Sequence, residues 1–131
     1  MAHAVVSPPI LRLKRSAQSG SKAMTVAYAV IYTESTVSGI AYIFAGAEFD
    51  LSNMAAGDVI AVRVRKVVIL GGGWVNHDEF GYTGVQPTGH PSKHINPIPD
   101  VYGVEISMGQ PTGTLISVPC EFFDAKRLGM P

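Results

Sequence analysis

Residues 59–83 read VIAVRVRKVVILGGGWVNHDEFGYT and hold the longest strand-like pattern of the chain. Val62 and Val64 alternate with basic residues, which is the period of a strand with one apolar and one polar face. The pattern then becomes continuously apolar, and three glycines follow that can close a tight turn. We therefore predict a β-hairpin made of two strands, residues 59–70 and 74–83.

The same period of two recurs on both sides of this hairpin. Apolar residues alternate with small or polar ones in five further stretches, which are residues 24–32, 40–44, 47–52, 101–108 and 114–123. No stretch of ten or more residues has the 3.6-residue period of a capped helix. About seven strands with turn residues between them predict an all-β fold, an antiparallel β-sandwich of jelly-roll type.

Composition divides the chain into three segments. Residues 1–22 are basic and end in a polar linker, so we predict an extended N-terminal arm. Residues 23–124 hold the strand patterns and form the sandwich domain, and residues 125–131 follow as a tail. Within the domain, residues 84–100 contain four prolines and two glycines. Because proline cannot donate a ladder hydrogen bond, we expect a long unpaired loop there.

The overall composition limits the classes of protein to consider. A chain of 131 residues, 47% hydrophobic and 15% charged, fits one globular domain. Ten basic residues balance ten acidic ones, which argues against nucleic-acid binding over the whole surface. The single cysteine, Cys120, leaves no internal disulfide and lies at an inward-facing position, so we interpret it as a core residue. We expect neither a membrane span nor a signal peptide.

Charge is distributed unevenly along the chain. Residues 1–33 carry four of the ten basic residues and none of the ten acids, so they sum to +4 and the remainder to −4. Two interpretations stay open for the arm: a disordered terminus without a role, or a segment that lies on neighbouring subunits or touches nucleic acid. Apolar residues among the bases favour the second. We expect subunit contacts from Ile10, Leu11, Arg12, Leu13, Lys14 and Arg15.

The sequence contains no constellation typical of catalysis or metal binding. A cupin-type metal centre needs an H-x-H pair and a carboxylate on one strand, whereas His77 stands alone beside Asp78. A hydrolase needs a nucleophile, a base and an orienting group, and the G-x-S-x-G elbow is absent. We therefore expect a protein that is not an enzyme and uses no metal and no cofactor.

Five residues remain as candidate contacts for a ligand or partner. His90 and His94 bracket a short turn and are either solvated loop histidines or ligands of an interface metal. Arg63 and Arg65 form either a basic binding strip or a solvated sheet face. Trp74, with the tyrosines, could stack on a sugar, although most tyrosines occupy core positions of the strand patterns.

Five short motifs follow one another between Phe49 and Phe123. They are D-L-S-N-(L/M)-x-x-G-D at 50–58, a V-x-V-R strand at 60–66, Y-(S/T)-G-x-Q at 82–86, G-V-x-(I/V)-(S/T)-x-x-Q-x-x-G at 103–113 and an aromatic strand at 121–123. Their order resembles a group of small β-rich structural proteins of phages and archaeal viruses over about 75 of 131 residues. The chain departs from this group in its longer proline-rich segment and in its basic arm, where several such proteins carry a coiled coil. The second departure favours a protein woven into a shell over a fibre tip.

The resemblance implies a non-enzymatic structural protein of the virion, as a capsid, cement or decoration subunit. Its partners would be copies of itself or other capsid proteins, so we expect a homo-oligomer. The arm could also contact the genome through Arg12, Lys14 and Arg15. The alternative is a β-sandwich module that binds a glycan or a host receptor through Trp74 and residues 84–100.

Overall fold

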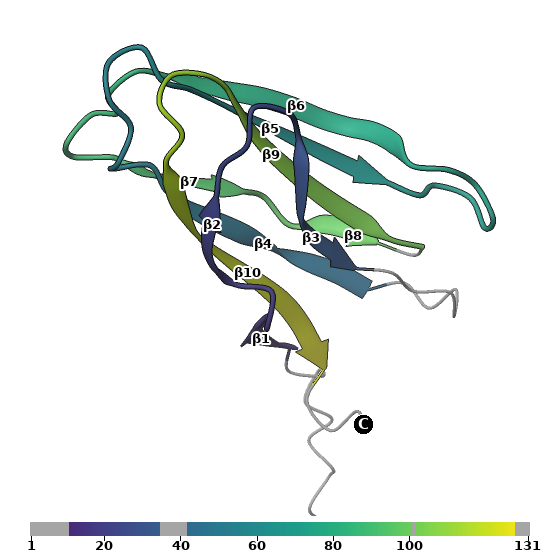
Figure 1. The fold of residues 1–131 in the computed structure, drawn as a ribbon. Helices are drawn as coiled ribbons and strands as arrows, with labels where there is room; N and C mark the ends of the chain where they lie inside the picture. Colours follow the sequence, from purple (N-terminus) through teal and green to yellow (C-terminus); the bar gives the residue numbers. More distant parts are fainter. Residues whose placement is uncertain (1–10, 35–41, 101, 128–131) are drawn as a thin grey trace, which may run out of the picture.

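The computed structural model describes residues 11–34, 42–100 and 102–127, and the fold is all-β, as predicted. Within these residues there is no helix, and ten strands form two antiparallel sheets (Figure 1). The strands are β1 (Leu11–Arg15), β2 (Gly20–Ala23), β3 (Ala29–Glu34), β4 (Tyr42–Asp50), β5 (Val59–Lys66), β6 (Val75–Thr83), β7 (Ser92–Ile95), β8 (Ile98–Asp100), β9 (Val104–Thr112) and β10 (Ser117–Arg127). The prediction of about seven strands is therefore too low. The last strand also extends into the segment predicted as a C-terminal tail.

The first sheet has six strands, which occupy four neighbouring strand positions because two of the positions hold a pair of short strands each. β10 and β4 pair with each other in its centre. Along the other side of β10, β2 pairs with residues 117–120 and β1 with residues 123–127. Along the far side of β4, β8 pairs with residues 42–44 and β7 with residues 47–50. Each edge of this sheet is thus formed by two short strands in succession.

The second sheet has the order β3-β9-β5-β6. The hairpin predicted from the alternating residues is confirmed as β5 and β6. However, β5 ends at Lys66, so the apolar residues 67–70 belong to the connecting loop and not to a strand. Gly71 lies in this loop with a φ of +76°, a conformation that glycine adopts without strain.

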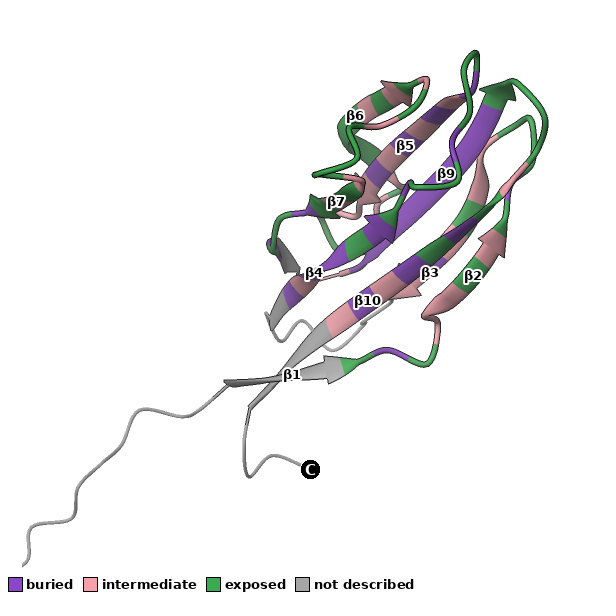
Figure 2. Ribbon diagram, turned by 90° about the vertical axis from the view of Figure 1, so that its left-hand side faces the viewer, coloured by how far each residue is buried: buried purple, intermediate pink, exposed green. Residues whose placement is uncertain are grey.

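Figure 2 shows buried stretches along β4, β5, β9 and β10, and aromatic side chains from both sheets meet in the core between them. The ring of Tyr32 in the second sheet stacks on Phe122 at 4.8 Å and lies 5.1 Å from Phe44, both in the first sheet. Phe49 meets Phe122 edge-on at 6.4 Å. Cys120 is 1% exposed in the same cluster, which confirms the prediction that it is a core residue. The inter-sheet aromatic contacts fix how the two sheets face each other.

The proline-rich segment differs from the expected unpaired loop. Residues 92–95 and 98–100 are strands β7 and β8, so the prediction that prolines exclude pairing there is wrong. Both strands lie at an edge of the first sheet, where a missing N–H can face the open side without breaking a ladder. Pro97 separates the two strands, and Pro99 pairs with Ile43.

Two strand predictions near the N-terminal half are also corrected. The alternation predicted for residues 24–32 fails, because Met24 and Tyr32 are buried whereas Val26 and Val30 are exposed. The pairing of β3 with β9 shifts its register between Val30 and Tyr32, which breaks the period of two. The stretches predicted as separate strands on either side of residue 46 form the single strand β4.

The described part of the predicted arm lies along the edge of the first sheet. β1 and β2 both pair with β10, and the link between them is also held. The Ser16 amide donates to the Phe122 carbonyl at 2.8 Å. The Gln18 side chain exchanges two hydrogen bonds with the backbone of Thr33, at 2.8 and 2.9 Å. Because Thr33 belongs to β3, Gln18 joins the two sheets at this edge.

Candidate functional site

A cleft of about 390 Å³ opens between the two sheets where β6 faces β7 and β8. β6 is an edge strand of the second sheet, and β7 and β8 form an edge of the first, so the cleft lies at an open side of the sandwich. The buried lining comprises Val64, Ile95 and Ile98, and the exposed lining includes His77, Asp78, His94 and Asn96. The cleft thus has an apolar base and a polar mouth.

The alternation of β6 supplies the aromatic wall of the cleft. Phe80 and Tyr82 lie two residues apart and meet edge-on, with ring centres 5.9 Å apart. Asp78 precedes them on the same side of the strand and pairs with Val64 of β5. Across the cleft, Lys93 of β7 places its Nζ 5.7 Å from the Tyr82 ring centre. Burial raises the pKa of the Tyr82 hydroxyl, so this hydroxyl is uncharged at neutral pH.

The chemistry of the cleft fits an amphipathic ligand. Aromatic edges and an apolar base can pack on the flat face of a ring, while carboxylate, imidazole and amide groups at the mouth can hydrogen-bond to hydroxyls. His77, Asp78 and His94 share the cleft, but they do not form a metal centre. Within the described residues, no three His, Cys, Asp or Glu side chains lie close enough together to hold an ion.

The structure brings one of the five predicted contact residues, His94, into the cleft. His90 is exposed in a separate turn, where its amide donates to the Pro87 carbonyl at 2.9 Å. The ring of Trp74 packs against Gly103, where an added Cβ would lie 3.0 Å from the indole Cη2. Trp74 does not line the cleft, and its contact with a sugar or receptor stays a prediction.

The two predicted arginines lie on the outer face of the second sheet, in contact with their neighbours. The guanidinium of Arg63 lies 4.4 Å from the ring centre of Tyr28, and the Tyr28 hydroxyl donates to Glu79 at 2.9 Å. Arg65 donates to Glu105 from Nε at 2.9 Å and from Nη2 at 2.5 Å, at a half-buried position. Arg65 is thus neutralised within the sheet, whereas Arg63 lies over an aromatic ring, and contact of either arginine with a partner stays a prediction.

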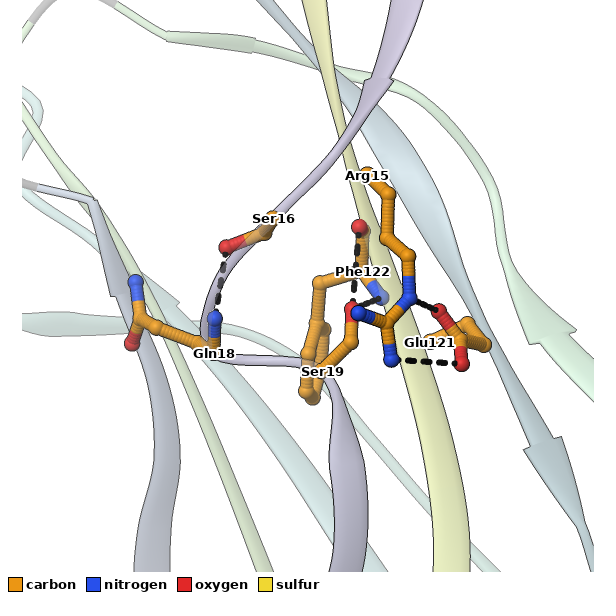
Figure 3. A network of polar contacts seen from close by, with 6 residues as sticks. All are labelled: Arg15, Ser16, Gln18, Ser19, Glu121 and Phe122. Carbon is orange, nitrogen blue, oxygen red and sulfur yellow. Dashed lines mark hydrogen bonds and ion pairs between the residues drawn. The ribbon is translucent and has the colours of Figure 1, made fainter.

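Arg15, the last residue of β1, is bound to β10 (Figure 3). Its Nε and Nη2 donate to the two carboxylate oxygens of Glu121 at 2.6 and 3.1 Å. This pair lowers the pKa of Glu121 and raises that of Arg15. The other predicted contacts of the arm lie outside the described part of the chain, which omits the whole of Ile10 and the side chains of Leu11, Arg12, Leu13 and Lys14. Their contacts with subunits or nucleic acid stay predictions.

The motif residues at 50–58 hold a turn. The Asp50 carboxylate accepts a hydrogen bond from the Ser52 amide at 2.9 Å, and hydrogen bonds from the Ser52 side chain and amide lower its pKa. The Asn53 amide group donates to the Ser117 carbonyl at 3.2 Å, tying the turn to β10. The buried Asp58 carboxylate accepts from the backbone amide three residues earlier at 2.8 Å. These polar side chains are structural, because each satisfies a backbone group of a turn or strand end.

The motif at 103–113 has the same character. Gln110 is 1% exposed, and its side-chain amide donates to the Thr114 carbonyl at 2.8 Å while its oxygen accepts from the Ile116 amide at 2.9 Å. Gly113 follows with a φ of +101°, and an added Cβ there would lie only 2.0 Å from the Asp58 carboxylate. The two motifs therefore meet at one end of the sandwich and shape its turns.

Among the residues that line the cleft, the sequence indicated Tyr82 only as one of several tyrosines that could stack on a sugar, and it did not single out Phe80. The alternation Asp78-x-Phe80-x-Tyr82 was visible, but it indicated only one face of a strand. The opposite wall comes from β7 and β8, which the prolines concealed. No local signal in the sequence indicates that these two edges lie opposite each other.

Comparisons with protein-family models, with curated proteins and with solved structures give no match to this chain. In the described residues, no helix is long and apolar enough to cross a membrane.

Proposed function

We propose that the protein is a non-enzymatic structural protein of a virion, as a capsid, cement or decoration subunit that associates with copies of itself or with a capsid lattice. The observation that carries the proposal is the nested pairing of its strands. The resemblance of residues 49–123 to structural proteins of phages and archaeal viruses supports the same function.

The strand pairing is nested around the β5–β6 hairpin. β5 pairs with β6, β4 with β7 and β8, β3 with β9, and both β1 and β2 with β10. This pairing is that of one long antiparallel hairpin with four strand positions in each of its two halves. The hairpin is rolled up so that successive positions of each half belong to different sheets. We interpret this order as a jelly roll of eight positions, two of which are split into pairs of short strands. Double-sheet jelly rolls recur in viral capsid and lectin domains.

A fold alone does not define a function, so the surface has to support the same conclusion. Val68, Ile69 and Leu70 are consecutive and are 63%, 68% and 69% exposed. Consecutive exposed apolar side chains of this size favour a surface that another molecule covers. In a shell, neighbouring subunits would cover such residues and add to the stability of each chain.

Light scattering after size exclusion, over a range of protein concentrations, tests the proposal. We expect masses that are multiples of the 13.9 kDa chain and that increase with concentration. A variant without residues 1–10 retains all described strands, so it separates the role of the N-terminal segment from folding. Reduced assembly with unchanged thermal unfolding would support subunit contacts by this segment. A single-chain mass of the full-length protein at every concentration would contradict self-assembly.

A second candidate function is a module that binds a glycan or a host receptor, and the inter-sheet cleft favours it. A glycan array with the purified protein would identify a ligand, and two histidine variants would locate its site. His94→Ala alters the cleft, whereas His90→Ala changes another exposed histidine that lies outside it. We expect only the first to weaken binding. An array without a bound glycan, or equal effects of both variants, would contradict a glycan site in the cleft.

A further inference from the structure

The loop between β5 and β6 projects from the end of the second sheet (Figure 1). We call residues 68–73 the apolar finger, because they comprise Val68, Ile69, Leu70 and three glycines and carry no charge. The three large side chains are each more than 60% exposed. An uncharged projection of this kind presents its side chains to another molecule.

The base and the turn of the apolar finger are held by specific contacts. The Val67 amide donates to the Gly103 carbonyl at 3.1 Å, which fixes the first side of the loop to the start of β9. On the second side, the Trp74 ring packs against Gly103. Within the loop, the Gly72 amide donates to the Ile69 carbonyl at 2.9 Å. The finger therefore presents Ile69 and Leu70 from a fixed base, which lowers the entropy cost of inserting them into a partner.

An apolar hollow of about 240 Å³ lies on the outer face of the same sheet. The residues at the base of this hollow have small side chains or none. Ala61 of β5 pairs with Gly109 of β9 on one side and with Gly81 of β6 on the other. Its lining carries no charged residue and consists of Val26, Ala27, Tyr28, Ala61, Gly109 and Pro111. Gly109 cannot carry a larger side chain, because an added Cβ would lie 2.9 Å from the Ala27 carbonyl oxygen.

The apolar finger and the hollow match in size and chemistry. A cavity of about 150 Å³ accepts benzene with its six carbons, so a hollow of about 240 Å³ has room for the eight side-chain carbons of Ile69 and Leu70. Both surfaces are apolar and uncharged, so their contact buries no unpaired charge.

The apolar finger cannot reach the hollow of its own chain. Ala61 lies near the start of β5, and the finger follows the end of the same extended strand. At about 3.3 Å per residue, Ala61 and Lys66, the last residue of β5, are about 17 Å apart, and the finger begins beyond Lys66. The two surfaces can therefore meet only between different molecules.

We infer that the apolar finger of one copy seats in the hollow of the next copy, with Ile69 and Leu70 against Ala61 and Tyr28. This inference deepens the proposed self-assembling function and rests on it. Finger and hollow are different surfaces, so the contact is head-to-tail and can repeat from copy to copy. Repetition of one such contact produces a closed ring when the rotation closes and a filament when it does not.

Charge substitutions on each surface test this inference, and the chain offers matched controls. Leu70→Asp disrupts the finger, with Leu115→Asp as control at another exposed leucine. Val26→Asp disrupts the hollow, with Val85→Asp as control, since both valines are 64% exposed. All four sites are exposed, and circular dichroism with thermal unfolding verifies that each variant folds. Ile69→Asp replaces Leu70→Asp if the latter is unfolded.

Light scattering over a concentration series gives the readout. We expect Leu70→Asp and Val26→Asp each to raise the concentration of half-association by more than about tenfold, and both controls to leave it unchanged. A mixture of the two disrupted variants is the decisive sample. Leu70→Asp retains an intact hollow and Val26→Asp an intact finger, so one head-to-tail contact remains and the mixture stops at pairs.

Three outcomes would overturn the inference, and they have different consequences for the proposed self-assembling function. Wild-type assembly by both Leu70→Asp and Val26→Asp overturns the finger contact but leaves self-assembly intact. A mixture that remains monomeric overturns the head-to-tail arrangement alone. A wild-type protein that is monomeric at every concentration overturns both the finger contact and self-assembly.

Discussion

Replacing Gln110 by methionine tests whether the motif at 103–113 is structural. The change keeps a side chain of similar length but removes the bonds to Thr114 at 2.8 Å and Ile116 at 2.9 Å. Each such bond contributes about 0.5–1.5 kcal/mol, so the free energy of unfolding should fall by about 1–3 kcal/mol. A third contact, to the Thr112 carbonyl at 3.4 Å, lies near the geometric limit and adds little.

Replacing Gln110 by glutamate adds a signature that depends on pH. The new carboxyl is buried and faces the Thr114 carbonyl, so its pKa in the folded protein lies above the unfolded value. The ionised form is therefore disfavoured in the folded state, and this variant is least stable at neutral pH. As the pH falls through the raised pKa, the neutral carboxyl can donate to Thr114, and stability relative to the wild type recovers.

Urea unfolding followed by the fluorescence of the single tryptophan, Trp74, measures both variants. Gln86→Met is the control, because the Gln86 amide makes one contact at 3.1 Å and a weaker one at 3.4 Å in a more exposed turn. We expect that control to cost less than about 1 kcal/mol. Gln110→Met with wild-type stability, or a Gln110→Glu variant without recovery at low pH, would refute a structural role for this side chain.

Three further predictions follow from single positions. Cys120→Ser should lower the free energy of unfolding by about 1–3 kcal/mol, because it places a hydroxyl in the core, and equal melting curves would contradict burial of this side chain. Burial also raises the pKa of the Cys120 thiol to about 12. We therefore expect no reaction of the folded protein with thiol reagents at neutral pH. Gly113→Ala should lower the free energy of unfolding clearly more than Gly57→Ala does. Both glycines have a positive φ, but only at position 113 would the new Cβ lie against a carboxylate oxygen, at 2.0 Å. Similar losses of stability in the two variants would contradict that contact. Glu121→Gln should change the melting temperature little at neutral pH, since the pair with Arg15 is exposed. The small contribution of this pair to stability is present at neutral pH and is lost as the pH falls through the lowered pKa of Glu121. An NMR titration of the wild type and of Arg15→Ala measures that pKa, and identical pKa values of Glu121 in the two proteins would contradict the pair.

Local patterns in the sequence predicted the all-β class, the β5–β6 hairpin and the inward face of β10. Val62 and Val64 are fully buried and Cys120 nearly so, as their alternation indicated. These predictions succeeded because period and turn chemistry depend on neighbours in the sequence. The loop residues 67–70 were assigned to a strand because continuous apolar character is also typical of a buried strand.

The edges of the first sheet and the cleft could not be predicted in the same way. β7, β8, β1 and β2 are three to five residues long, and their pairing with β4 and β10 depends on partners far away in the sequence. The prolines suggested an unpaired loop because proline breaks the ladder of a central strand. Proline is tolerated in an edge strand, and local sequence does not indicate whether a strand is central or at an edge. The cleft combines β6 with β7 and β8, so the missed edge strands also concealed Phe80 and Tyr82 as its wall.

Negative-stain electron microscopy of the full-length protein at high concentration tests the central claim most directly. If the chain is a self-assembling shell subunit, the images will contain rings, tubes or closed particles of uniform size, and Leu70→Asp will disperse them while Leu115→Asp will not. A field of single 13.9 kDa chains under the same conditions would contradict self-assembly and would leave the inter-sheet cleft as the stronger basis for a function.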